Sequence, residues 1–158
     1  MVFCGFNPGV ASGLSGHYYA HPSNHFWRLL ADSGLTPRRL RPEEDGEMLA
    51  MGYGFTDLVR RMSRSSADLG TLELRRGARR VRAELARYQP RICAFTGKGV
   101  ARAVVGRPVG TGWLGEPVVA GVRGMVLASP SGLAAMAAAE RLAPYLALAA
   151  ALDQPPPA

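Results

Sequence analysis

The chain begins with the stretch Met1-Val-Phe-Cys-Gly-Phe-Asn-Pro-Gly9, in which six mostly apolar residues run straight into a polar turn. A short apolar run bounded by turn residues is typical of a buried strand that ends in a loop. Arg91–Thr96 has the same character, and the turn Gly97-Lys98-Gly99 follows it. We therefore expect two buried strands, each with a loop at its carboxyl end.

Segments with a helical pattern alternate with the expected strands. Ser23 or Asn24 can cap a helix that ends near Ser33, and an amphipathic helix is expected over Glu73–Tyr88. Its apolar stripe consists of Leu74, Ala78, Val81, Leu85 and Tyr88. Further helices are expected over 42–51, 99–105 and 133–152, further strands over 118–120 and 125–128, a turn or short strand over 53–59, and a long ordered loop over 9–23. Strands that alternate with helices predict an α/β protein, a three-layer α/β/α domain around a central, largely parallel sheet.

Length and composition narrow the class of protein. A chain of 158 residues has room for one domain, which we expect over 1–152, with a Pro-rich tail over 153–158. No run of eighteen apolar residues is present, so we expect no membrane span. Two cysteines, Cys4 and Cys93, are too few for a disulfide scaffold or a four-cysteine metal site, which favours a cytoplasmic location.

The net charge of +7 favours a polyanionic partner. Eighteen of the nineteen basic residues are arginines, and Lys98 is the only lysine. The arginines of the 73–88 helix could contact phosphates or form a solvated face. The arginines that flank the loops are equally good candidates for phosphate contacts: Arg60, Arg61, Arg64 and Arg123.

Three polar segments follow the expected strands, at the sheet edge where parallel α/β proteins bind ligands. They are Gly5-Phe-Asn-Pro-Gly9 with its continuation Ala20-His-Pro-Ser-Asn-His-Phe-Trp27, then Gly54-Phe-Thr-Asp57, and finally Ser129-Pro-Ser-Gly-Leu133. The first and last of these segments resemble the mismatch-specific uracil/thymine DNA glycosylases, a family of the uracil-DNA glycosylase superfamily. The likeness covers nearly the whole chain, and its motifs occur in the same order.

This resemblance implies a uracil-DNA glycosylase-like α/β/α domain and a monofunctional DNA glycosylase of base excision repair. Such an enzyme flips uracil out of mismatched double-stranded DNA and hydrolyses its N-glycosidic bond, which leaves an abasic site. Thymine and bulkier damaged pyrimidines are further candidate bases. The implied partner is duplex DNA with U·G or related mismatches, bound by a monomer without a metal or other cofactor.

The resemblance also assigns roles to individual residues. Asn7 matches the asparagine that positions the attacking water, and Tyr19 matches an aromatic residue that stacks on the flipped base. The residues expected to form the base pocket are Phe6, Gly9, Ser12, Tyr19 and Ser129. The residues that match a loop inserted into the duplex are Pro130, Ser131, Gly132 and Leu133.

The sequence departs from the related enzymes at several pocket positions. Gly9 stands where stricter uracil enzymes have a tyrosine that excludes the thymine methyl group, so we expect a permissive pocket. Leu127-Ala128-Ser129 lacks the histidine of the fastest uracil enzymes, and Ser129 replaces a common asparagine. We therefore expect modest turnover.

Asp57 is a second catalytic candidate, because a carboxylate at this strand end could activate water or stabilise the sugar cation. The alternative is a structural role, in which Asp57 caps a turn or pairs with Arg60 or Arg61. Tyr19 likewise has an alternative role as a core aromatic residue.

Other chemistries fit the residues less well. His17, His21 and His25 are four apart, but Pro22 breaks any helix there, which argues against a metal site. Gly97-Lys98-Gly99 lacks the upstream glycine of a phosphate-binding loop, so a nucleotide hydrolase is disfavoured. A lyase step needs an amine, and only Lys98 and the terminal amine are available to supply one. The alternative function that stays open is a non-catalytic protein that binds lesions or mismatches.

Overall fold

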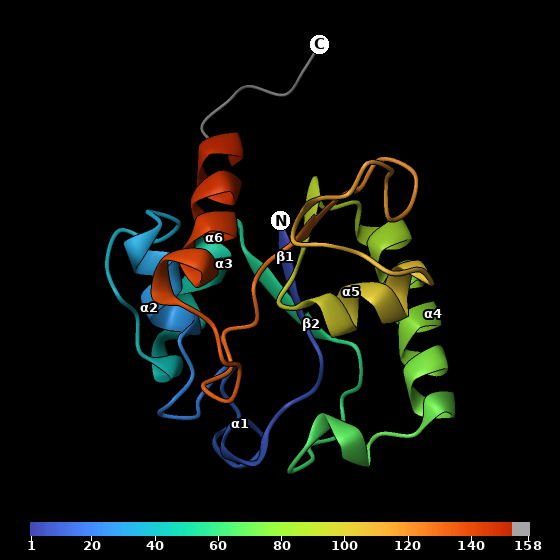
Figure 1. The fold of residues 1–158 in the computed structure, drawn as a ribbon, viewed down its shortest axis with the longest axis horizontal. Helices are drawn as coiled ribbons and strands as arrows, with labels where there is room; N and C mark the ends of the chain where they lie inside the picture. The colour runs from blue at the N-terminus through green and yellow to red at the C-terminus, as the bar shows by residue number, and fades with distance from the viewer. Residues whose placement is uncertain (153–158) are drawn as a thin grey trace.

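A five-stranded sheet lies at the centre of the computed structural model, which describes residues 1–152 (Figure 1). The strand order is β2-β1-β3-β5-β4. The strands are β1 (Val2–Gly5), β2 (Gly54–Asp57), β3 (Ile92–Phe95), β4 (Gly112–Trp113) and β5 (Arg123–Val126). All pairs are parallel except β4 with β5. The predicted three-layer α/β/α class with a largely parallel sheet is confirmed.

Helices cover both faces of the sheet (Figure 1). One face carries α2 (Phe26–Asp32), α3 (Glu47–Ala50) and α6 (Ala138–Leu152), and the other carries α4 (Thr71–Tyr88) and α5 (Lys98–Val105). Successive residues of a strand point to opposite faces of the sheet, so each strand contributes to the hydrophobic cores on both faces. In β3, Ile92 and Ala94 belong to one core cluster, and Cys93 and Phe95 belong to the other. Short helical turns complete the fold: α1 (Val10–Ser15) and the 3₁₀ turns Pro42–Glu44 and Ser66–Asp68.

Several expected elements differ from those in the structure. The expected loop over 9–23 contains α1, and the expected helix over 42–51 is divided into a 3₁₀ turn and α3. Residues 118–120 are not a strand, because Val119 makes only an isolated bridge to Val122 around Gly121, whose φ is 81°. The antiparallel β4 was not expected at all. Tyr88 is 69% exposed and therefore does not belong to the apolar stripe of α4.

Close packing of α4 fixes the carboxyl end of β2. A Cβ at Gly77 would lie 1.9 Å from the carbonyl oxygen of Leu58, so only glycine allows this approach. One helical turn further along, the Arg80 guanidinium donates to the backbone carbonyls of Asp57 and Leu58 and pairs with Glu84. Arg80 therefore supports the strand that carries Asp57.

Leu152 is the last residue that the structure describes, so the expected domain boundary there stays a prediction, and the expected tail over 153–158 lies outside the described residues. Among the described residues, no helix has the length and apolar character needed to cross a membrane.

Candidate active site

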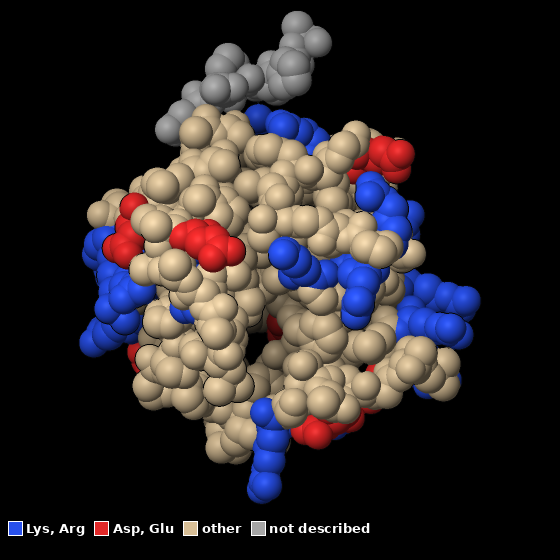
Figure 2. All heavy atoms as spheres, in the orientation of Figure 1, with Lys and Arg blue, Asp and Glu red and all other residues tan. Residues whose placement is uncertain are grey.

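The carboxyl ends of the parallel strands surround a pocket with a volume of about 1130 Å³. Figure 2 shows it as a hollow, with Lys and Arg side chains at parts of its edge. The pocket brings together all the residues that the sequence predicts for the site: Phe6, Asn7, Gly9, Ser12, Tyr19, Asp57, Ser129, Pro130, Ser131, Gly132 and Leu133. Segments that lie far apart in the sequence therefore meet in one cavity.

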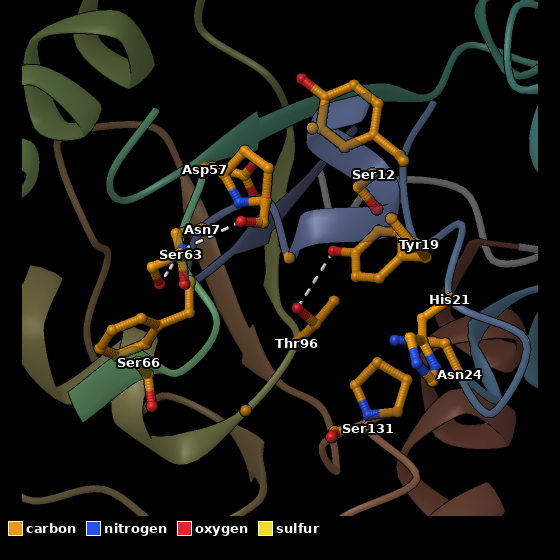
Figure 3. Close-up of a pocket in the computed structure, with 18 of the residues that line it drawn as sticks. Asn7, Ser12, Tyr19, His21, Asn24, Asp57, Ser63, Ser66, Thr96 and Ser131 are labelled. Atoms are coloured by element: carbon orange, nitrogen blue, oxygen red, sulfur yellow. Dashed lines mark hydrogen bonds between the residues drawn. The ribbon is translucent and has the colours of Figure 1, made fainter. Parts of the chain in front are cut away.

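The side-chain amide of Asn7 is held in one orientation. Its Nδ2 donates to the carbonyls of Pro8 (3.0 Å) and Arg61 (3.2 Å) and to Ser63 Oγ at 2.8 Å (Figure 3). Ser63 Oγ donates its single proton to the Ser65 carbonyl at 2.7 Å, so it can only accept from Asn7. These contacts use the amide nitrogen and leave Asn7 Oδ1 available to accept a hydrogen bond from water.

Asp57 presents an unpaired carboxyl group to the same pocket. No described residue forms a hydrogen bond or ion pair with this carboxyl group. Arg60 pairs with Glu84 and Arg61 with Glu73, so neither arginine is the partner that the structural alternative for Asp57 expected. Burial raises the pKa of Asp57 to about 6, and the positive charge of Arg80 partly opposes this effect.

Gly5 makes room for the Asp57 carboxyl group. A Cβ at Gly5 would lie 2.3 Å from Asp57 Oδ1 and 3.2 Å from the Tyr19 hydroxyl oxygen. The carboxyl and hydroxyl groups are therefore near neighbours above β1. Burial, followed by the charge of Asp57, raises the pKa of Tyr19 well above its ordinary value, so Tyr19 keeps its proton.

Two contacts fix the Tyr19 side chain, one on the face of its ring and one at its hydroxyl group. The ring stacks on Phe26 with 3.8 Å between centroids, and its hydroxyl group lies 3.1 Å from Thr96 Oγ1 (Figure 3). Thr96 donates its own proton to the Cys4 carbonyl, so Tyr19 is the donor in this pair. The φ of 53° at Tyr19 places the ring in the pocket, and the ring takes part in the core while it lines the cavity.

Two small residues, Gly9 and Ser12, line another part of the pocket. A Cβ at Gly9 would meet no atom within 4 Å, so this wall of the pocket is open. Ser12 Oγ accepts from the backbone N–H of Ala20 at 3.0 Å and thereby holds the segment that leads away from Tyr19. Phe6 forms another wall, and its ring packs against Gly99 at the start of α5.

The segment Ser129–Leu133 forms an ordered loop at the pocket edge. Ser129 Oγ accepts from Ser131 N–H and Ser131 Oγ accepts from Leu133 N–H, each at 3.3 Å. The Pro130 carbonyl accepts from His25 N–H at 2.8 Å, which ties the loop to the start of α2. Leu133 is 95% exposed at the outside of this loop.

The cations at the pocket edge differ in their pairing. Arg64 and Lys98 line the pocket and have no ion-pair partner among the described residues, whereas Arg60 pairs with Glu84. Arg123 stacks on the ring of Trp113, and no residue of α4 lines the pocket. Arg64 and Lys98 are therefore the cations best placed to meet a phosphate there.

The three histidines do not form a metal site. His17 Nδ1 lies 3.3 Å from Asp45, and His21 Nδ1 lies 2.9 Å from Ser23 Oγ. Within residues 1–152, no group of three His, Cys, Asp or Glu side chains is arranged to hold a metal ion.

Sequence reasoning missed two residues that shape the site, Ser63 and Thr96. Both act on other site residues through contacts between distant segments, since Ser63 bonds to Asn7 across 56 positions and Thr96 bonds to Tyr19 across 77. The only signal for Thr96 was its place at the end of an expected strand, and Ser63 had none.

The pocket lies at the carboxyl end of a parallel sheet, where parallel α/β proteins bind their ligands, and it is lined by a strand-end asparagine and an ordered edge loop. A family model for the uracil DNA glycosylase superfamily matches residues 1–153. The chain therefore belongs to the uracil DNA glycosylase superfamily. Membership places it among DNA-binding hydrolases that cleave the glycosidic bond between base and sugar, and supports activity on uracil in base excision repair.

Proposed function

We propose that this chain is a monofunctional DNA glycosylase that flips uracil out of mismatched duplex DNA, U·G pairs above all, and leaves an abasic site. The observation that carries the proposal is the convergence of Asn7 Oδ1 and the Asp57 carboxyl group in one pocket beside the Tyr19 ring. We further propose that it acts as a monomer without a cofactor.

The reaction begins with extrusion of the base. Rotating a nucleotide out of the duplex costs a few kcal/mol, and less for a mismatched pair. Leu133 on the edge loop fills the space that the base leaves, which keeps the extruded state populated. The extruded base then lies against Tyr19 and Phe6.

Bond cleavage produces an oxocarbenium-like sugar and an anionic base. The ionised carboxylate of Asp57 stabilises the sugar cation or takes a proton from the attacking water. Asn7 Oδ1 accepts a hydrogen bond from that water and orients it towards the sugar carbon. Backbone N–H groups of the first strand-end loop stabilise charge on the leaving base.

The substrate range follows from the open wall at Gly9. Because a Cβ at this position would meet nothing within 4 Å, a methyl group or larger substituent on the pyrimidine finds space there. We therefore extend the proposal to thymine and to bulkier damaged pyrimidines, with modest turnover because no imidazole follows β5.

The proposal is tested with duplexes that contain U·G, U·A or T·G pairs and with single-stranded uracil, followed by alkali cleavage of the product. We expect abasic product from U·G at the highest rate and none from the Asn7→Ala variant. DNA binding without abasic product on any substrate would instead establish the lesion-binding alternative.

A second arm of the experiment tests the monofunctional assignment, since Lys98 lies at the pocket edge. Borohydride should trap no covalent protein–DNA adduct, because hydrolysis by water forms no Schiff base. An adduct that disappears in Lys98→Arg would show that Lys98 supplies a lyase activity.

A further inference from the structure

The edge loop that carries Leu133 rests on the body of the protein on two sides. On one side, Gly132 packs on Ser23, where a Cβ would lie only 2.6 Å from the Ser23 carbonyl oxygen. On the same side, His25 N–H donates to the Pro130 carbonyl at 2.8 Å. The first half of the loop is therefore docked on the segment that leads into α2.

The other side of the loop is held by Arg141 of α6. Its Nη2 donates to the backbone carbonyl of Ala134, the residue that follows Leu133. Ala134 N–H in turn donates to the Ser131 carbonyl, which closes the turn around Leu133. Arg141 of α6 thus contacts the second half of the loop, directly after Leu133.

Arg141 occupies an unusual environment for an arginine. The residue is only 6% exposed, its Nε has no hydrogen-bond partner, and no carboxylate of the described residues pairs with it. An uncompensated buried charge is costly, and an apolar side chain of similar size commonly gives a more stable protein. Stability alone therefore does not explain an arginine at this position.

We propose that Arg141 is a positioning residue that holds the Leu133 loop in the shape needed to enter the duplex. This inference rests on the proposed function. Entry of Leu133 into the base stack pushes the loop back towards the body of the protein. The bond from the rigid α6 to the Ala134 carbonyl resists that push, because a charged donor holds a carbonyl more strongly than a neutral one.

The experiment is a double-mutant cycle on a U·G duplex under single-turnover conditions, with Arg141→Met, Leu133→Ala and the pair. Arg141→Met retains most of the apolar packing and removes the donors. We expect it to lower the rate about tenfold, the loss typical of a hydrogen bond to a charged group. In the Leu133→Ala background the same change should cost less than about twofold, because two residues that act through one step are not additive.

Matched variants separate positioning from a general structural role. Arg141→Lys keeps a charged donor and should recover part of the rate, and Glu140→Gln, at the exposed neighbouring position, serves as the control. A 2-aminopurine next to the uracil reports base extrusion, and its fluorescence change should fall in Arg141→Met in parallel with the rate. Equal losses of rate from Arg141→Met in both Leu133 backgrounds would overturn the proposal.

A measurement without DNA keeps this inference separate from the proposed function. Methyl relaxation of Leu133 in isotopically labelled protein should show greater mobility in Arg141→Met than in the parent and in Glu140→Gln. If the parent excises no base but this difference is present, the proposed function fails while the anchoring by Arg141 holds. Identical Leu133 mobility in all three proteins would contradict the anchoring itself.

Discussion

Burial raises the pKa of the Asp57 carboxyl group, and this pKa determines whether the group can act as a base at neutral pH. Because its pKa lies near 6 instead of 3.8, the carboxyl group is largely ionised at neutral pH yet retains appreciable basicity. A general base works best when its pKa lies close to the working pH. Burial beside the Tyr19 hydroxyl group thus gives Asp57 properties that an exposed aspartate lacks.

The first prediction concerns the pH dependence of the single-turnover rate. If the ionised form of Asp57 is the active one, the rate rises as the pH increases through about 6 and is constant above it. Asp57→Asn should lower the rate at neutral pH more than tenfold and abolish the pH dependence. A loss of less than about tenfold would return Asp57 to a structural role.

The second prediction concerns Ser63, which sets the orientation of the Asn7 amide. Ser63→Ala removes the acceptor at 2.8 Å and should reduce the single-turnover rate about tenfold, because Asn7 no longer holds water in one position. Ser63→Thr retains the hydroxyl group and should recover most of the rate. Affinity for DNA that already contains an abasic site is the control and should be similar in all three proteins.

The location of Asn7 and Asp57 in one pocket could be predicted from the sequence, because each lies in a polar segment at the end of an expected strand, whereas Tyr19 was assigned to the pocket only through the family resemblance. Ser63 and Arg141 could not. Their importance depends on which backbone or side-chain atom lies opposite them, and only the tertiary structure brings Ser63 to Asn7 and Arg141 to Ala134. The unpaired carboxyl group of Asp57 could not be predicted either, since Arg60 and Arg61 were available as partners.

Among the elements, α4 and β2 are joined by the closest backbone approach described above. The third prediction is that Gly77→Ala lowers the free energy of unfolding by about 2 to 3 kcal/mol, because the new Cβ meets the Leu58 carbonyl at 1.9 Å. Gly46→Ala is the matched control, since a Cβ there meets no atom within 4 Å. In urea denaturation, Gly77→Ala should have a clearly lower unfolding midpoint than the parent, whereas the midpoint of Gly46→Ala should be unchanged or higher.

The Gly77 contact also connects stability to the site, because β2 delivers Asp57. A separation of α4 from Leu58 would move the Arg80 guanidinium away from the Asp57 carbonyl. If Gly77→Ala unfolds at the same urea midpoint as the parent, α4 can move away from Leu58 without a loss of stability, and this result would contradict the close packing.

Elements with a strong hydrophobic pattern could be predicted from the sequence, and elements without one could not. Although β1 and β3 have only four residues each, they are continuous apolar runs bounded by turn residues, and α4 has an amphipathic pattern over 18 residues, so these three elements could be recognised. The two residues of β4 and the six of α1 carry too little pattern, and their structure depends on what they pack against. Val118–Ala120 has a strand-like composition, but the turn at Gly121 and its neighbours leaves only the single bridge at Val119.

At the scale of the whole molecule, only part of the positive charge lies at the pocket edge. The exposed arginines of α4 lie on a helix that contributes nothing to the pocket lining. Arg64 is an exposed pocket residue without an ion-pair partner among the described residues. The net charge of +7 therefore overstates the charge that meets DNA at the site.

The fourth prediction compares Arg64→Ala with Arg79→Ala on α4. Loss of a phosphate contact weakens binding and reduces the slope of log affinity against log salt concentration by about one. We expect this change for Arg64→Ala and a parent-like slope for Arg79→Ala, measured by fluorescence anisotropy on a duplex over a range of salt concentrations. A slope reduced in Arg79→Ala as well would place α4 in the DNA interface, and a parent-like slope for Arg64→Ala would remove Arg64 from it.

The burial of both native thiols makes the protein suited to site-specific labelling. Cys4 and Cys93 have no exposed surface, and burial raises the pKa of Cys93 well above its ordinary value, so neither thiol is available to a maleimide. A cysteine placed at the 95% exposed position of Leu133 would be the single reactive thiol of the folded chain, without prior removal of the native ones. A fluorophore attached there would time the entry of the loop into a duplex directly in a stopped-flow experiment.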